Sequence, residues 1–140
     1  NWTPMARKVY QYGDGEHASQ IINKEYWYKK GITWGLITSS MPSFRIMPEA
    51  ATFDKGGSTI IVENEVYMFT LGLLNSKVYL KIVSMLNPTL NFQVKDIRAM
   101  PLILNNKDII SKIVAIIVEM SREDCDAYAT SWDFKKNPLV

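Results

Sequence analysis

The chain of 140 residues has few of the residues on which disulfide, metal and membrane structures depend. Its one cysteine, Cys125, excludes an internal disulfide, and together with its one histidine, His17, supplies too few ligands for a zinc site. No apolar run reaches the roughly 20 residues that cross a bilayer. No cationic segment followed by an apolar one opens the chain. We therefore expect a cytoplasmic protein without membrane partners.

The chain also lacks a recognisable catalytic constellation. Residues 55–58 (KGGS) contain the glycines of a phosphate-binding loop in the wrong order, and we interpret them as a hairpin turn. His17 stands alone in a predicted loop, where a surface role is the ordinary one. Asp124 and Asp126 lie in an acidic helix start, which the helix dipole explains. By itself the chain is predicted to catalyse nothing.

What is present is the composition of a globular domain. Apolar residues make up 47% of the chain and charged residues 21%, which excludes a disordered or low-complexity chain. The net charge is +2, and the basic excess lies in residues 1–104, which carry 11 Lys and Arg against 8 Asp and Glu. This distribution weakly favours a nucleic-acid partner. Because the chain begins at Asn1, we expect a piece of a longer protein.

The first part of the chain has strand character. Aromatic and β-branched residues dominate positions 26–37, which predicts a strand broken near Gly31 and Gly35. Polar and apolar residues alternate at 43–46, so Phe44 and Ile46 are expected on one face of a strand and Arg45 on the other. Further strands are predicted at 51–53 and 59–62, and a short strand with a loop within 1–25.

The second part has helical periodicity. Residues 65–86 predict one long helix or two short ones, because Asn75-Ser76 can act as an N-cap between them. Residues 89–104 are predicted to be irregular, with a helical turn at 94–98 and a strand at 102–104. Asn106 is expected to cap an amphipathic helix over 107–120 with an isoleucine packing face, and a shorter helix should begin at Ser121 and run toward Thr130.

The predicted fold class is therefore α+β. A β-rich lobe with one or two helices at 65–86 is expected to occupy residues 1–104. A helical spacer and a C-terminal tail with Trp132 and Phe134 are expected to occupy residues 105–140. The tail aromatics have no visible partner in the sequence, so we expect them to pack on another part of a larger multidomain protein.

Several motifs occur in an order typical of one family. These are residues 28–34 (YKKGITW), 43–45 (SFR), 71–79 (LGLLNSKVY), 86–94 (LNPTLNFQV) and 131–134 (SWDF). Over roughly residues 6–140 the chain resembles the C-terminal half of the BREX phage-defence adenine-specific DNA methyltransferases. One departure is Cys125, where the family pattern has an aromatic residue, and this affects the local packing of the last helix.

The resemblance implies a target recognition domain that reads double-stranded DNA. It places the S-adenosylmethionine pocket in an upstream methyltransferase domain of the same parent chain, so no cofactor is expected here. In agreement, residues 87–90 (NPTL) lack the second proline and the aromatic residue of the catalytic loop that holds a flipped adenine, and Pro88 is interpreted as a helix stop. Other defence-system subunits are further candidate partners.

Within such a domain, Arg45 is the first candidate for reading bases. A guanidinium on a strand can bond O6 and N7 of guanine together, and the major groove distinguishes all four base pairs. The alternative is a surface salt bridge to Glu49 or Asp54. Hydroxyl contacts to phosphates or bases are the second prediction, with turn formation as the alternative; the residues concerned are Thr38, Ser39, Ser40 and Ser43.

Lysine and amide side chains complete the predicted site. Lys29, Lys30 and Lys55 are expected to neutralise DNA phosphates, which positions a domain without conferring sequence choice. Asn91 and Gln93 either pair with adenine or satisfy the local backbone. A different function remains open, because the helix at 107–120 and the aromatic tail suit a docking module for another defence subunit or a phage inhibitor.

Overall fold

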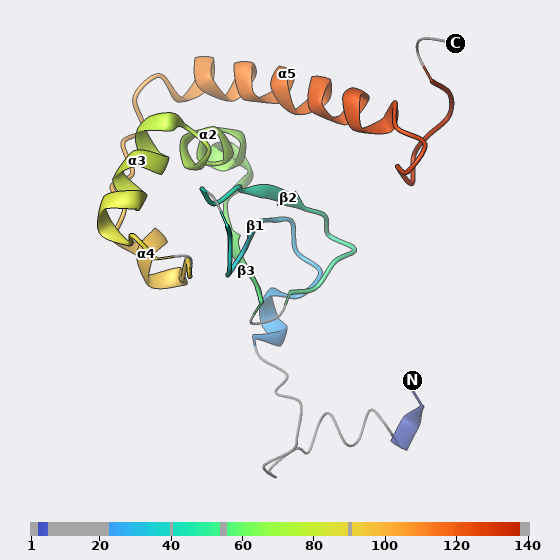
Figure 1. Ribbon diagram of the computed structural model, residues 1–140, viewed down its shortest axis with the longest axis horizontal. Helices are drawn as coiled ribbons and strands as arrows, with labels where there is room; N and C mark the ends of the chain where they lie inside the picture. The colour runs from blue at the N-terminus through green and yellow to red at the C-terminus, as the bar shows by residue number, and fades with distance from the viewer. Residues whose placement is uncertain (1–2, 6–22, 40, 54–55, 90, 138–140) are drawn as a thin grey trace.

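The computed structural model describes residues 3–5, 23–39, 41–53, 56–89 and 91–137. A small antiparallel sheet is followed by helices, so the α+β prediction is confirmed (Figure 1). The elements are η1 (Lys24–Tyr26), β1 (Gly31–Gly35), β2 (Arg45–Met47), β3 (Gly57–Ile61), α2 (Asn64–Leu74), α3 (Lys77–Leu86), α4 (Val94–Arg98) and α5 (Lys107–Asp126). Among the described residues, no helix has the length and apolar character needed to span a membrane.

Strand β1 is the centre of the sheet, and β2 and β3 are its edges. Both pairings are antiparallel, and Ile32 of β1 lies opposite Ile46 and Ile60. Side chains alternate between the two faces of a strand, so Ile32 and Trp34 point to the same side. Both are buried against the helices. Thr33, between them, belongs to the opposite face and pairs with Arg45 in register.

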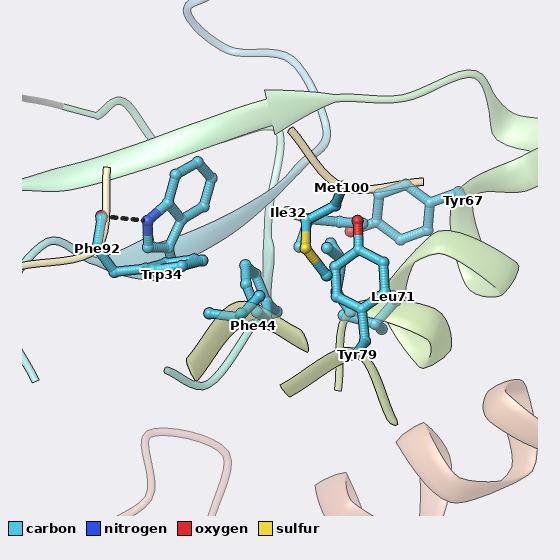
Figure 2. Close-up of a cluster of buried hydrophobic side chains, with 10 residues drawn as sticks. Ile32, Trp34, Phe44, Tyr67, Leu71, Tyr79, Phe92 and Met100 are labelled. Atoms are coloured by element: carbon cyan, nitrogen blue, oxygen red, sulfur yellow. Dashed lines mark hydrogen bonds between the residues drawn. The ribbon is translucent and has the colours of Figure 1, made fainter. Parts of the chain in front are cut away.

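The core is built around aromatic side chains from distant segments. The rings of Trp34, Phe44 and Phe92 lie within 6.4 Å of one another, centroid to centroid. The buried indole Nε1 of Trp34 donates to the carbonyl oxygen of Phe92 at 3.0 Å, as Figure 2 shows. This bond crosses 58 residues of sequence. Strand β1 is thereby fixed to the segment that precedes α4.

Two helices, and not one, occupy the 65–86 region. Helix α2 ends at Leu74, and the Ser76 hydroxyl accepts a hydrogen bond from the amide nitrogen of Tyr79 at 3.2 Å. This is the N-cap geometry that satisfies a free amide in the first turn of a helix. The predicted cap is therefore confirmed at Ser76.

Helix α5 runs along one side of the molecule beside α2, and its C-terminal half extends beyond α2 (Figure 1). The two helices approach closely at Gly72, where an added Cβ would overlap the Val114 side chain. Val114 and Val118 pack against the core. The isoleucine face predicted to be a packing face is instead exposed in this chain, and α5 contains no buried residue.

Several predicted strands are absent from the described structure. Residues 26–30 are not a strand, because Tyr26 is the last residue of the 3-10 helix η1 and Tyr28 has a left-handed backbone with φ 57°. Residues 51–53 and 102–104 are irregular, since neither segment pairs with a strand among the described residues. Most of the strand and loop predicted within 1–25 lies outside the described residues.

The predicted break at Ser121 is also wrong. Helix α5 continues to Asp126, and the Ser121 hydroxyl donates to the carbonyl oxygen of Ile117 at 2.8 Å, a bond that a serine inside a helix can make. Asn106 lies at the N-cap position of α5 with a left-handed backbone, φ 54°, and its side chain makes no capping hydrogen bond. Its carbonyl oxygen accepts from the amide of Ile110 at 3.1 Å.

Candidate functional site

The predicted reading residues come together where the chain enters β2. Ser43 and Arg45 are exposed, and Phe44 between them is buried in the core. The predicted alternation is thus confirmed. Arg45 Nη2 donates to the Ser43 hydroxyl at 3.2 Å, so the two polar side chains lie on the same outer side. We call residues 43–45 the β2 entry segment.

The surroundings of Arg45 bear on its alternative role in a salt bridge. Among the described residues, Arg122 and Glu119 form an ion pair on the surface of α5, with 3.6 Å between Arg122 Nη1 and Glu119 Oε2. Arg45 forms none with Glu49. Asp54, the other acid considered, lies outside the described residues. Within the described part, the guanidinium is therefore available to a ligand.

The main chain of the β2 entry segment is held from the end of α2. The Asn75 side-chain oxygen accepts from the Phe44 amide at 3.1 Å, and its side-chain nitrogen donates to the Phe44 carbonyl oxygen at 3.0 Å. The same nitrogen donates to the carbonyl oxygen of Leu71 at 3.0 Å. The sequence marked Asn75 as a helix boundary residue; its contact with Phe44 was missed, because no local pattern indicates it.

The hydroxyl loop between β1 and β2 borders the same region. Ser39 is exposed and Thr38 is half-buried, whereas Ser40 lies outside the described residues. The amide of Phe92 donates to the carbonyl oxygen of Leu36 at 2.7 Å, and Ile37 forms a β-bridge with Asn91. Asn91 is therefore a direct neighbour of the chain that leads into this loop, although it is distant in sequence.

Gln93 and Asn91 are exposed, but their main-chain atoms are engaged locally. The Gln93 amide donates to Asp96 Oδ2 at 2.8 Å, and the same oxygen accepts from Asn87 Nδ2 at 2.7 Å. Asn87 Nδ2 also donates to the carbonyl oxygen of Asn91 at 2.8 Å. Buried Asp96 thus orders the turn before α4. The predicted base contacts of Asn91 and Gln93 stay predictions.

The predicted phosphate lysines lie at the other end of β1. Lys29 and Lys30 immediately precede Gly31, which pairs with Met47 at the far end of β2. The Lys30 ammonium lies 4.2 Å above the Tyr67 ring centroid, and that of Lys29 lies 5.5 Å from the Tyr26 centroid. Lys55 lies outside the described residues. The structure therefore does not gather Lys29 and Lys30 with the β2 entry segment, and the predicted role of Lys55 stays a prediction.

A groove of about 800 Å³ separates the β2 entry segment from α5. Arg45 and Asn75 line one side of it, and Arg122, Cys125 and Asp126 line the other. Sequence reasoning missed Arg122, because α5 was expected to end before it. Among the described residues, no cluster of His, Cys, Asp and Glu could hold a metal ion. The groove thus offers guanidinium donors and apolar walls to a ligand.

The chain matches no family model. It is 35% identical over 128 residues to the adenine-specific methyltransferase BrxX of Escherichia coli O9:H4 (strain HS), covering 89% of this chain and 10% of BrxX. It is 29% identical over 127 residues to the adenine-specific methyltransferase PglX of Lacticaseibacillus casei (strain Zhang), covering 90% of this chain and 11% of PglX. The chain thus spans about a tenth of the length of these curated relatives. The resemblance seen in the sequence is confirmed, because about nine tenths of this chain is similar to a segment of two adenine-specific methyltransferases, BrxX and PglX.

Proposed function

We propose that this chain is the part of an adenine-specific DNA methyltransferase that recognises the target sequence in double-stranded DNA. The observation that carries the proposal is the β2 entry segment, where exposed Arg45 and Ser43 flank a Phe44 that is buried and held through its main chain. The chain supplies no catalytic group in this proposal. An upstream methyltransferase domain of the parent chain binds S-adenosylmethionine and transfers the methyl group, in phage defence.

The physical reason is preorganisation. A long arginine side chain loses rotamer entropy when it binds a base, and a fixed backbone lowers the remaining cost of ordering. The main chain of Phe44 is already bonded on both its amide and its carbonyl, and the Ser43 hydroxyl already engages the Arg45 guanidinium. A bidentate contact to guanine is worth about 1–3 kcal/mol of discrimination against the wrong base.

The test is the methylation motif of the full-length enzyme. Arg45→Ala should relax one position of the methylated sequence, because the remaining contacts still place the domain on the duplex. Arg98→Ala is the matched control, since Arg98 is also exposed but lies on α4. Sequencing that detects methylated adenines would read out both variants. A motif left unchanged by Arg45→Ala would contradict the assignment.

A second function, protein docking, is favoured by the outer face of α5. Ile109, Ile113, Ile116 and Met120 are each more than half exposed in the chain. Apolar surface gathered on one helix face is typical of an interaction site. In this proposal the face binds the upstream methyltransferase domain or another defence-system subunit, and it is compatible with DNA reading at the β2 entry segment.

Docking can be tested with the purified upstream domain and with each purified defence subunit. The double variant Ile113→Lys/Ile116→Lys should abolish complex formation, because two charges would be buried in an apolar contact. Val78→Lys is the control, since Val78 is an exposed apolar residue of α3. If both variants bound as well as the unaltered chain, α5 would not be the docking surface.

A further inference from the structure

The Asn75 side chain takes the place of a neighbouring strand at the β2 entry segment. Strand β2 is an edge of the sheet, and its register with β1 covers Arg45, Ile46 and Met47. Phe44 precedes that ladder. Its amide and carbonyl oxygen are instead bonded to the oxygen and nitrogen of the Asn75 amide group, at 3.1 and 3.0 Å. A primary amide carries both a donor and an acceptor, so it can pair with a peptide unit as another backbone would.

The pairing has a rigid base. Asn75 directly follows α2, its side-chain nitrogen also donates to the carbonyl oxygen of Leu71, and its own amide nitrogen donates to that oxygen at 3.3 Å. Leu71 is buried in the same core cluster as Phe44. The end of a core helix is thereby connected to the residue between Ser43 and Arg45. Rotation of the Phe44 peptide planes would displace both flanking side chains.

We propose that Asn75 is a positioning residue for DNA recognition, which sets the direction of the Arg45 guanidinium without touching DNA itself. This rests on the proposed function of the β2 entry segment. The consequence concerns sequence choice more than affinity. Loss of the Asn75 amide should degrade discrimination at the base position that Arg45 reads, while contacts to the DNA backbone made elsewhere persist.

The neighbouring serine provides a matched control. Ser76 caps α3 through the Tyr79 amide and makes none of the Phe44 contacts. Ser76→Ala therefore disturbs the same helix junction and leaves the β2 entry segment in place. A variant that acts merely by loosening the junction would behave like Ser76→Ala.

The experiment uses the full-length protein and selection from a library of randomised DNA duplexes, in which every short sequence competes for binding. Asn75→Ala, Arg45→Ala, Ser76→Ala and the double variant Asn75→Ala/Arg45→Ala are compared with the unaltered protein at matched folded fractions. We expect Asn75→Ala to lower discrimination by about fivefold or more at the position that Arg45→Ala relaxes, the lower end for a bidentate base contact. The double variant should lose little beyond Arg45→Ala, because both changes remove one interaction. Ser76→Ala should keep the motif.

The failure of the proposed function and the failure of the positioning role give different results. If the unaltered protein selects no sequence, the proposed function and the positioning role of Asn75 are both refuted. If it selects a motif that Asn75→Ala retains, or that Asn75→Ala and Ser76→Ala weaken evenly at every position, DNA reading stands and the positioning role is refuted. Asn75→Asp serves if the alanine variant does not fold. It keeps the acceptor for the Phe44 amide and loses the donor to the Phe44 carbonyl, so a partial loss at the same position is expected.

Discussion

The hydroxyl of Tyr67 offers a sharp test of how the sheet is joined to α2. Tyr67 is 1% exposed, and its hydroxyl donates to the carbonyl oxygen of Gly31 at 2.8 Å, within the core shown in Figure 2. Tyr67→Phe removes the donor and retains the ring. The Gly31 carbonyl oxygen then loses a buried partner, which costs about 1–3 kcal/mol of unfolding free energy.

The pH dependence of this loss gives a second, independent signature. Burial raises the pKa of Tyr67 above its usual value of 10.0. In alkali the unfolded chain therefore loses the phenolic proton before the folded chain does, so stability from this group is complete below pH 10 and declines as the pH rises through the folded pKa. The difference in unfolding free energy between the unaltered chain and Tyr67→Phe should therefore become smaller above pH 10.

Tyr79→Phe is the matched control. Burial also raises the pKa of Tyr79, but its hydroxyl bonds to none of the described residues. Like Tyr67→Phe, Tyr79→Phe should lose less unfolding free energy in alkali than the unaltered chain does. Unlike Tyr67→Phe, it should lose little unfolding free energy at pH 7. Urea unfolding followed by tryptophan fluorescence, at pH 7 and at several values above pH 10, measures both quantities. Equal stability of Tyr67→Phe and the unaltered chain at pH 7 would refute the importance of the bond to Gly31. A gap that stays constant above pH 10 would refute the titration argument.

Two further predictions concern the helix contact and the lysines. Gly72→Ala gains about 1 kcal/mol of helix propensity but forces a methyl group onto Val114, an overpacking cost of about 1–3 kcal/mol, so a net loss is expected in urea unfolding. The same change should become stabilising in a Val114→Ala background; a loss there would show that the contact is not the cause. Lys29→Ala should weaken binding to all DNA duplexes alike and reduce the salt dependence of that binding by about one released ion. The control Lys81→Ala, on α3, should change neither the affinity nor its salt dependence. A changed sequence preference in Lys29→Ala would contradict a phosphate contact.

Local signals explain the predictions that the structure confirms. The division between α2 and α3 depends on the Ser76 hydroxyl and an amide three residues later. The outward direction of Arg45 follows from alternation along a strand. The turn at α4 likewise uses residues close in sequence, Gln93 and Asp96. Interactions between residues that are close in sequence can be predicted from the sequence alone.

Several of the failed predictions depend on distant partners. Residues 102–104 have strand composition, but a strand forms when another strand supplies its hydrogen bonds, and none does so in the described structure. The periodicity of α5 predicts apolar faces on the helix, but it does not indicate which of them packs against the rest of the protein. Contact with Gly72 of α2 selects Val114 and leaves Ile113 and Ile116 exposed.

The sequence by itself determined the fold class, the candidate helix cap at Asn75-Ser76 and the family resemblance, because periodicity, caps and ordered motifs are properties of neighbouring residues. Only the tertiary structure decided how the candidate site is built. It brought Asn75 to Phe44 across 31 residues and Trp34 to Phe92 across 58. It also placed Lys29 and Lys30 beyond the Gly31 end of β1, whereas Arg45 lies opposite Thr33 in the middle of that strand. Hydrogen bonds between distant segments form when the core brings them together, and no local pattern encodes that geometry.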